Sequence, residues 1–102
     1  MSQFQPCTYI MASGRRGYVY IGVTSHLLQR VAQHRDRSID GYSKDRNTVC
    51  LVRYELFGTM EQAIGREKQL KNWHRDWKFN LVESENPDWV DLAPDLGLGR
   101  LP

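Results

Sequence analysis

The chain of 102 residues has room for one domain and is too short for two. With 40% hydrophobic and 25% charged residues, its composition is that of a globular protein and excludes a disordered one. No apolar run approaches the roughly 18 residues that a membrane helix needs, and the first residues lack the pattern of a secretory signal, so we expect a cytoplasmic protein. Two cysteines, Cys7 and Cys50, are too few for a disulfide framework or a zinc site, and their apolar neighbours predict buried free thiols.

The net charge of +2 conceals an uneven distribution along the chain. Residues 15–53 carry eight Arg or Lys against three Asp, whereas residues 83–102 carry five acidic residues and one Arg. A basic body of this kind attracts polyanions such as nucleic acids. A solvated basic surface without a partner explains the same charges, so charge alone does not assign a function.

The first elements predicted are the two strands of a β-hairpin. Residues 7–12 and 17–23 are rich in strand formers and are separated by residues 13–16. A four-residue loop would pair Ala12 with Gly17 and would place Tyr9 opposite Tyr20 on one face of the sheet. A cross-strand aromatic pair without a catalytic role is the better explanation when the two tyrosines are taken alone.

A helix is predicted to follow the hairpin, with Thr24 and Ser25 as its N-cap and its end near Arg37. Arg30 and His34 are four residues apart and are therefore neighbours on one face of this helix. A surface Arg–His pair is the simpler explanation when the two residues are taken alone. The next segment, residues 38–47, forms a polar loop long enough to suggest a function.

The second half of the chain predicts a third strand and further helices. The residues Thr59 and Gln62 form a capping-box pattern at the start of one helix. Three strands, the first two in an antiparallel hairpin, together with the helices indicate an α+β domain. We expect this domain to span residues 1–92, followed by a flexible tail at 93–102. In chain order, the predicted elements are a strand at 48–57, helices at 60–72 and 73–82, and a last helical turn at 87–92.

Glu67 is a charged residue at a position where the helix pattern predicts burial. Met60, Ala63, Ile64 and Leu70 mark the buried stripe of the helix, and Glu67 lies inside that stripe. Burying a carboxylate costs on the order of several kcal/mol unless it is paired or binds a cation. A salt bridge to an arginine and a metal ligand are about equally good explanations.

Basic and aromatic residues alternate after Glu67, in a pattern that suits phosphate contacts beside aromatic surface. Core tryptophans with basic neighbours that extend into solvent explain the tryptophans at least as well. The basic residues are Lys68, Lys71, Arg75 and Lys78, and the aromatic ones are Trp73, Trp77 and Phe79.

Phosphodiester hydrolysis needs a group that activates water, a cation for the charge on the phosphate, and a donor for the leaving oxygen. A tyrosine serves as the base only if a nearby cation or basic side chain lowers its pKa of about 10. Arg30 and a metal ion held by Glu67 would supply such a field. One carboxylate, together with waters and phosphate oxygens, suits Mg²⁺.

The order of these residues resembles the GIY-YIG nuclease family. The resemblance extends over about residues 6–92. Over this range the chain is similar to small stand-alone bacterial members of the family, which resemble the N-terminal nuclease domain of the bacterial repair excinuclease. The resemblance is carried by Thr8-Tyr9-Ile10 and Val19-Tyr20-Ile21-Gly22, by residues 28–34 with the functional arginine, by residues 63–71 with the metal-binding glutamate, followed by Trp73, and by Asn86-Pro87-Asp88-Trp89.

This resemblance implies a three-stranded antiparallel sheet flanked by helices and one Mg²⁺ or Mn²⁺ ion. It makes Tyr9 the leading candidate for the general base, with Tyr20 positioning water or phosphate, although position does not decide which tyrosine is the base. Arg30 would stabilise the phosphate, His34 stands at the place of a site tyrosine or histidine, and Glu67 would hold the metal. Contacts to nucleic acid are assigned to five basic residues, Lys44, Lys68, Lys71, Arg75 and Lys78.

Two positions depart from the family pattern. The first motif begins with Thr8, preceded by Cys7, where the family has glycine. Val23 stands where some members carry a lysine just after the second motif. Lys44, in the polar loop, could supply that positive charge.

The sequence therefore predicts a monomeric, metal-dependent endonuclease that cuts DNA and acts in DNA repair, with RNA left open as a substrate. A nucleic-acid-binding module on the same scaffold without catalysis is the second hypothesis, and retention of the complete residue set favours catalysis over it. A protein-interaction domain that uses Trp73, Trp77 and Trp89 as anchors is the third.

Overall fold

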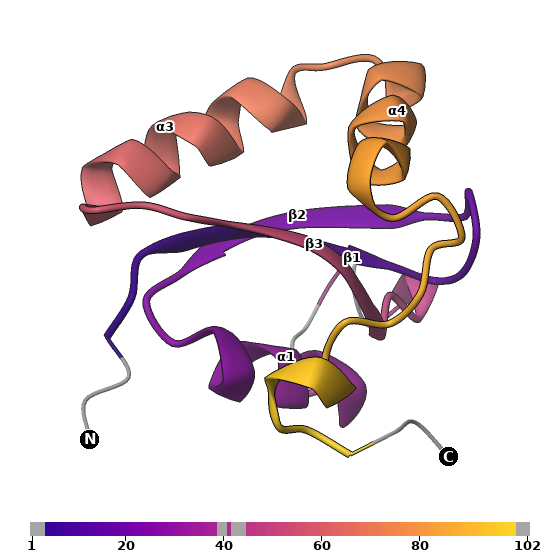
Figure 1. The fold of residues 1–102 in the computed structure, drawn as a ribbon, viewed down its shortest axis with the longest axis horizontal. Coiled ribbons are helices and arrows are strands. Elements are labelled where there is room, and N and C mark those ends of the chain that lie inside the picture. Colours follow the sequence, from indigo (N-terminus) through magenta and orange to yellow (C-terminus); the bar gives the residue numbers. More distant parts are fainter. Residues whose placement is uncertain (1–3, 39–40, 42–44, 100–102) are drawn as a thin grey trace.

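A computed structural model describes residues 4–38, 41 and 45–99 of the protein. Its three-stranded sheet has the order β2-β1-β3, both neighbours run antiparallel to β1, and helices cover both faces (Figure 1). The predicted α+β fold is confirmed. The strands are β1 (Cys7–Ala12), β2 (Val19–Thr24) and β3 (Cys50–Leu56). Helices α3 (Met60–Lys71) and α4 (Arg75–Glu85) lie on one face, and α1 (Leu27–Arg35) and the 3-10 helix η1 (Pro94–Leu96) lie on the other.

Strand β1 divides the core into two layers because its side chains alternate between the two faces of the sheet. Ile10 and Ala12 pack in the layer beneath α3 and α4, whereas Tyr9 and Met11 pack in the layer against α1. As the central strand, β1 is buried along its whole length. Cys7 is fully buried and carries a free thiol, as predicted.

The hairpin between β1 and β2 has a different register from the predicted one. Its loop spans residues 13–18, so Ala12 pairs with Val19 and not with Gly17. Because the shift is by two residues, each side chain keeps its face of the sheet. The rings of Tyr9 and Tyr20 therefore still lie together, with their centroids 6.2 Å apart, although the two residues are diagonal and not opposite.

The start of α1 also differs from the prediction. Thr24 is the last residue of β2, and the helix begins at Leu27 with His26 as an N-cap that makes no side-chain capping bond. The Thr24 hydroxyl accepts a hydrogen bond from the His26 backbone N–H at 3.0 Å, so it supports the turn into the helix and not the helix itself. Half of the predicted functional loop at 38–47, including Lys44, lies outside the described residues.

Helix α3 begins as the capping-box pattern predicts. The Thr59 side chain accepts a hydrogen bond from the Gln62 backbone N–H at 3.2 Å. The Gln62 side chain in turn accepts from the backbone N–H of Gly58, one residue before the cap. The next helix, α4, begins two residues later than predicted and extends to Glu85.

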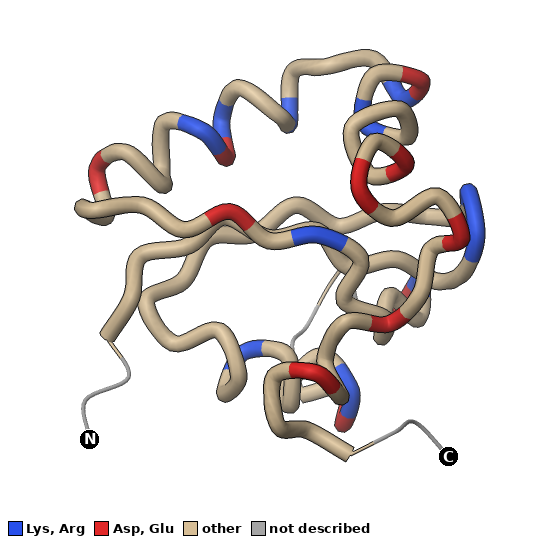
Figure 2. Tube along the Cα trace, in the orientation of Figure 1, with Lys and Arg blue, Asp and Glu red and all other residues tan. Residues whose placement is uncertain are grey.

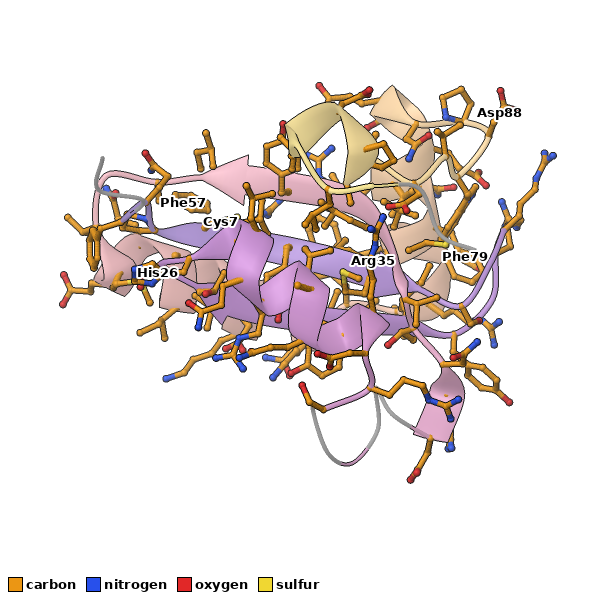
Figure 3. The ribbon with its side chains drawn as sticks, turned by 90° about the horizontal axis from the view of Figure 1, so that it is seen from below. Cys7, His26, Arg35, Phe57, Phe79 and Asp88 are labelled. Atoms are coloured by element: carbon orange, nitrogen blue, oxygen red, sulfur yellow. The ribbon has the colours of Figure 1, made fainter. Side chains whose placement is uncertain are left out.

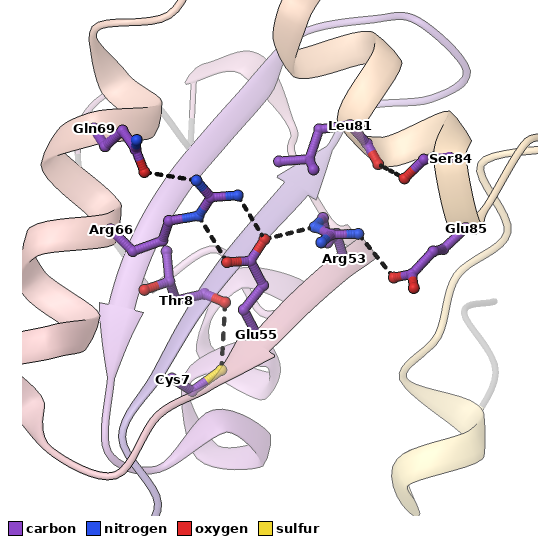
Figure 4. A network of polar contacts seen from close by, with 9 residues as sticks. All are labelled: Cys7, Thr8, Arg53, Glu55, Arg66, Gln69, Leu81, Ser84 and Glu85. Carbon is purple, nitrogen blue, oxygen red and sulfur yellow. Dashed lines mark hydrogen bonds and ion pairs between the residues drawn. The ribbon is translucent and has the colours of Figure 1, made fainter.

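A network of charged side chains fastens α3 and α4 to β3 (Figure 4). Glu55 accepts hydrogen bonds from Arg66 of α3 and from its strand neighbour Arg53, each at 2.8 Å, and Arg53 also pairs with Glu85 of α4. Burial raises the pKa of Glu55, but the hydrogen bonds and charges of the two arginines outweigh burial and hold that pKa below its ordinary value. The network thus fixes both helices relative to the sheet edge formed by β3.

The helical turn predicted at 87–92 does not form. Trp89 has a left-handed backbone conformation with φ of 57°, which interrupts a helix. The Asn86 side chain organises the segment instead, donating to the carbonyls of Val52 and Val90 and accepting from the Val90 N–H. A local side-chain network therefore competes successfully with helix formation here.

The segment predicted as a flexible tail packs against the α1 face, at least as far as residue 99. Ala93 is fully buried, and the short helix η1 follows it. Leu96 and Leu98 pack against the core layer that contains Tyr9. Among the described helices, none has the length and apolarity that crossing a membrane requires.

Candidate active site

Two tyrosines and a histidine meet between the sheet and α1. The Tyr9 hydroxyl and His34 Nε2 share a hydrogen bond of 2.9 Å, and both side chains are almost fully buried. The His34 ring also lies 4.8 Å from the Tyr20 ring, edge to face. The sequence predicted each residue as a site residue, and the fold brings the three together although they come from β1, β2 and α1.

Gly22 provides the space that the Tyr9 ring occupies. It is the residue of β2 that pairs with Tyr9, and a Cβ atom at this position would lie 2.4 Å from the Tyr9 hydroxyl oxygen. No side chain fits at that distance, so the glycine of the second motif is required for the tyrosine of the first. The sequence reveals the motif but not this dependence, which follows from the observed register.

Burial raises the pKa of Tyr9 well above its ordinary value, and the neighbouring Tyr20 raises it further. The charge of Arg30 acts in the opposite direction, as expected from the sequence, but it is weaker than burial. The carboxylate of Glu67 adds a further contribution that raises this pKa. In the protein without a bound cation, Tyr9 is therefore a neutral phenol.

His34 is shifted toward its neutral form. Burial, followed by the charge of Arg30, lowers its pKa to about 4. At pH 7 the imidazole is therefore uncharged, so one ring nitrogen carries a hydrogen and the other can accept a hydrogen bond. A neutral imidazole beside a neutral phenol forms a pair through which a proton can move.

Glu67 lies on α3 between the buried residues Ala63 and Leu70, with 16% of its side chain exposed. Ile64, predicted for the same buried stripe, is exposed, so the stripe is narrower than expected. The carboxylate oxygen Oε2 lies 3.1 Å from Nζ of Lys71, which replaces the expected arginine partner. The other oxygen, Oε1, makes no hydrogen bond within the described part of the chain.

Glu67 fits a metal ion that takes few ligands from the protein. One of its oxygens is available, and its lysine partner is more than half exposed, which makes that ion pair weak. Nowhere in residues 4–38, 41 and 45–99 do three His, Cys, Asp or Glu side chains gather into a complete metal cage. The donor set therefore suits Mg²⁺ or Mn²⁺, which retain water and bind substrate phosphates, better than a structural zinc ion.

Tyr9 and Glu67 lie on opposite faces of the sheet, Tyr9 in the layer against α1 and Glu67 on α3 (Figure 1). One pocket of about 270 Å³ joins Arg30 of α1 to Met60 at the start of α3 across the end of β2. A second pocket, of about 310 Å³, is lined by Tyr20 of β2 and by Lys71 of α3. Groups from both helices are thus accessible along one strand edge.

Basic residues continue this edge beyond the site. Lys78 of α4 lines the pocket that contains Tyr20, and it also lines a third pocket of about 190 Å³ with Arg75 and the end of the hairpin loop. Figure 2 shows Lys and Arg gathered on the second half of α3 and the first half of α4. Lys68 is exposed on α3 but lines none of these three pockets, and Lys44 lies outside the described residues.

The three tryptophans differ in their surroundings. Trp89 is buried and donates a hydrogen bond to Glu83, and Trp73 packs against the core layer under α3 and α4. Trp77 is 55% exposed, with its ring edge to face against Trp73. Core packing therefore explains two of the tryptophans but not the third.

Thr8, the departure from the first motif, connects the strand of the site to the helix that carries Glu67. Its buried hydroxyl donates a hydrogen bond of 2.7 Å to the carbonyl of Ala63. Ala63 lies one helical turn before Glu67, so the contact sets the height of that turn over β1. This positioning role was not predicted, because the two residues are 55 positions apart in the sequence.

Comparison with known proteins shows the family to which the chain belongs. The family model described as the GIY-YIG catalytic domain matches residues 5–80. Similar proteins named UPF0213 come from Staphylococcus haemolyticus (32% identical over 64% of this chain and 79% of the relative), Clostridium perfringens (31% over 78% and 86%) and Bacillus licheniformis (29% over 84% and 89%), and these names state no activity. No solved structure matches the chain. Because the family model covers more than half of the chain and includes both tyrosine motifs and Glu67, the protein belongs to the GIY-YIG family.

Proposed function

We propose that this protein is a metal-dependent endonuclease that hydrolyses phosphodiester bonds in DNA, with Tyr9 as the group that activates water. The observation that carries the proposal is the buried hydrogen bond of 2.9 Å between Tyr9 and a neutral His34. A phenol and an imidazole in this arrangement can pass a proton, and Arg30 and Glu67 supply the charges that a phosphate and a cation require.

Tyr9 would work with His34 and not as an isolated base. Burial disfavours a free phenolate, so the phenol would release its proton to His34 Nε2 while its oxygen takes a proton from the attacking water. The water oxygen would form the new bond to phosphorus, in line with the bond that breaks. The leaving oxygen would then take a proton from solvent, and the protonated His34 would release one to solvent, which restores the neutral pair. This concerted transfer requires the His34 tautomer whose proton is on Nδ1.

Arg30 and Tyr20 would hold the phosphate. The guanidinium of Arg30 presents a fork of donors that matches phosphate oxygens. Tyr20 is partly exposed in a pocket that it shares with Lys71 and Lys78, where its hydroxyl can meet a substrate. Glu67 would hold one Mg²⁺ or Mn²⁺ ion through Oε1, and the ion when bound would supply positive charge beside the phosphate oxygens.

The proposal is tested by incubating the purified protein with duplex, single-stranded, nicked and branched DNA and with RNA, in Mg²⁺, Mn²⁺ or EDTA. We expect metal-dependent cleavage of DNA that is abolished in Glu67→Gln. Glu61→Gln, an exposed carboxylate on the same helix, serves as the matched control and should cleave normally. Cleavage that persists in EDTA, or in a folded Glu67→Gln variant, would contradict the assignment of the metal ligand.

A nucleic-acid-binding module without catalysis is the second candidate. The basic pockets along β2 favour it, because they would bind a phosphate backbone whether or not the strand is cut. Binding without cleavage on every substrate, by a protein with an intact Tyr9–His34 pair, would support this module over the nuclease.

A further inference from the structure

The pocket beside Arg30 contains two glutamine side chains that the proposed reaction does not use. It lies between α1, the end of β2 and the first residue of α3, and it has a volume of about 270 Å³. Gln29 and Gln33 line it together with Arg30. Gln33 lies four positions after Gln29 and three after Arg30, so it is a neighbour of both on the surface of α1. Figure 3 shows α1 from this side, with His26 at its start and Arg35 at its end.

The amides of Gln29 and Gln33 are available to a ligand. Neither side chain makes a hydrogen bond to any residue in the described part of the chain. Their neighbours on the buried face of α1, Val31 and His34, fix the helix against the sheet. The two amides are therefore presented by a rigid element, one helical turn apart, in the same pocket as the arginine proposed to bind the scissile phosphate.

The lining of the pocket suits a nucleobase better than a second phosphate. Among the described residues that line it, Arg30 is the only Lys or Arg, and that charge is already assigned to the scissile phosphate. A glutamine amide offers a donor and an acceptor together, which matches the hydrogen-bonding edge of a base. Val23 and Met60 add apolar surface for the face of a base, as in most small-ligand sites.

We infer that this pocket binds the base next to the scissile phosphate and that Gln29 and Gln33 read its edge, so that the protein has a sequence preference at one position beside the cut. This inference rests on the proposed function, because Arg30 must hold the phosphate for the neighbouring base to reach the pocket. One good bidentate contact to a base is sufficient for a preference on the order of 10-fold.

The test is cleavage of a DNA library randomised around the cut, with the cleaved ends sequenced. We expect the wild type to show a preference at one flanking position and the double variant Gln29→Ala/Gln33→Ala to lose it, while its rate on the disfavoured sequences stays within about twofold, since those sequences lack the contact. Gln69→Ala removes an amide on α3 outside the pocket and should keep the preference. Cleavage without any preference in the wild type, or an unchanged preference in the double variant, would overturn the inference.

A binding measurement separates this inference from the proposed function. The four deoxynucleoside monophosphates and deoxyribose 5-phosphate are titrated into protein labelled with ¹⁵N, and the side-chain amide signals of Gln29 and Gln33 are followed by NMR. Shifts that depend on the base would support the subsite even if no DNA is cleaved. Equal responses to all four nucleotides and to the sugar phosphate, or no response at all, would overturn it.

Discussion

The shifted pKa of His34 predicts how the stability of the fold depends on pH. An unfolded chain would titrate this histidine near 6.5, whereas burial lowers its pKa in the folded protein to about 4. Because the folded-state pKa is depressed, protonation favours the unfolded chain. The stability associated with neutral His34 is fully present above pH 6.5 and is lost as the pH falls toward 4.

A shift of this size corresponds to about 3 kcal/mol of unfolding free energy, at 1.36 kcal/mol per pKa unit. The measurement is urea denaturation followed by tryptophan fluorescence at several pH values from 7.5 to 4, for the wild type and for His34→Gln. We expect the difference in unfolding free energy between the two proteins to change by about 3 kcal/mol in favour of the variant over that range. Carboxylates such as Glu55 titrate in both proteins, so their contribution cancels in the difference.

The control for this experiment is His26→Gln, which removes an exposed histidine at the start of α1. Its pH profile should follow that of the wild type. If the His34→Gln profile also runs parallel to the wild type, His34 is not held neutral by the fold, and the proposed transfer of a proton from Tyr9 loses its acceptor.

Three further substitutions test contacts around the site. Gly22→Ala should destabilise the protein by about 1–3 kcal/mol in thermal unfolding and abolish cleavage, because the added Cβ overlaps the Tyr9 ring. Thr8→Val should cost about 1 kcal/mol through the lost hydrogen bond to α3, and it should raise the metal concentration needed for half-maximal cleavage. Lys71→Met removes an exposed ion pair worth at most about 1 kcal/mol, so Glu67 no longer has a partner that competes with a metal ion. Mn²⁺ should therefore stabilise this variant against unfolding at concentrations up to about fivefold lower than the wild type requires.

A specific result would contradict each of these three predictions. Gly65→Ala is the control, because a Cβ atom added at that position would have no heavy atom within 4 Å, and this variant should be as stable as the wild type. If Gly22→Ala is equally stable, the Tyr9 ring is not confined by Gly22. Thr8→Ser keeps a hydroxyl and should restore the metal dependence of the wild type. An Mn²⁺ requirement that rises in Lys71→Met would mean that Lys71 assists the cation site and does not compete with it.

The sheet and α3 could be predicted from the sequence because their signals are local. Strand formers between turn residues mark β1 and β2, and the Thr59 capping box marks the first residue of α3. The hairpin register could not be predicted in the same way. It depends on a six-residue loop in which the Ser13 side chain accepts from the Tyr18 N–H, and composition does not reveal this bond.

The helical turn predicted near the C-terminus does not form because a tertiary contact outweighs the local preference for a helix. Pro87 favours the start of a helix, but the Asn86 side chain bonds to the carbonyl of Val52 on β3 and draws the chain into an irregular turn. The residues that follow were expected to be flexible because they are rich in Gly, Pro and Leu. Their leucines instead pack beside α1 on the sheet face that carries Tyr9, in the same core layer as Leu27 and Val31.

For the site, the sequence predicts the members but not how they act on one another. The spacing of Arg30 and His34 placed them together on α1, the hairpin placed Tyr9 beside Tyr20, and the helix pattern singled out Glu67. The family resemblance then supplied a role for each of them. Burial was the missing quantity, because charges alone suggested a lowered pKa for Tyr9, whereas desolvation dominates in the folded protein. The hydrogen bond to His34 then becomes the feature that makes Tyr9 a reasonable catalytic group.

Adjacent residues of β1 connect the two halves of the site through opposite faces of the sheet. Tyr9 points to the α1 layer and bonds His34, while Thr8 points to the other layer and bonds the helix that carries Glu67. Because side chains alternate along a strand, two successive residues suffice to position both helices relative to the edge of β2. A slip of β1 by one residue would exchange its two faces and break both contacts at once. The two hydrogen bonds therefore specify the register of the central strand as well as the geometry of the site.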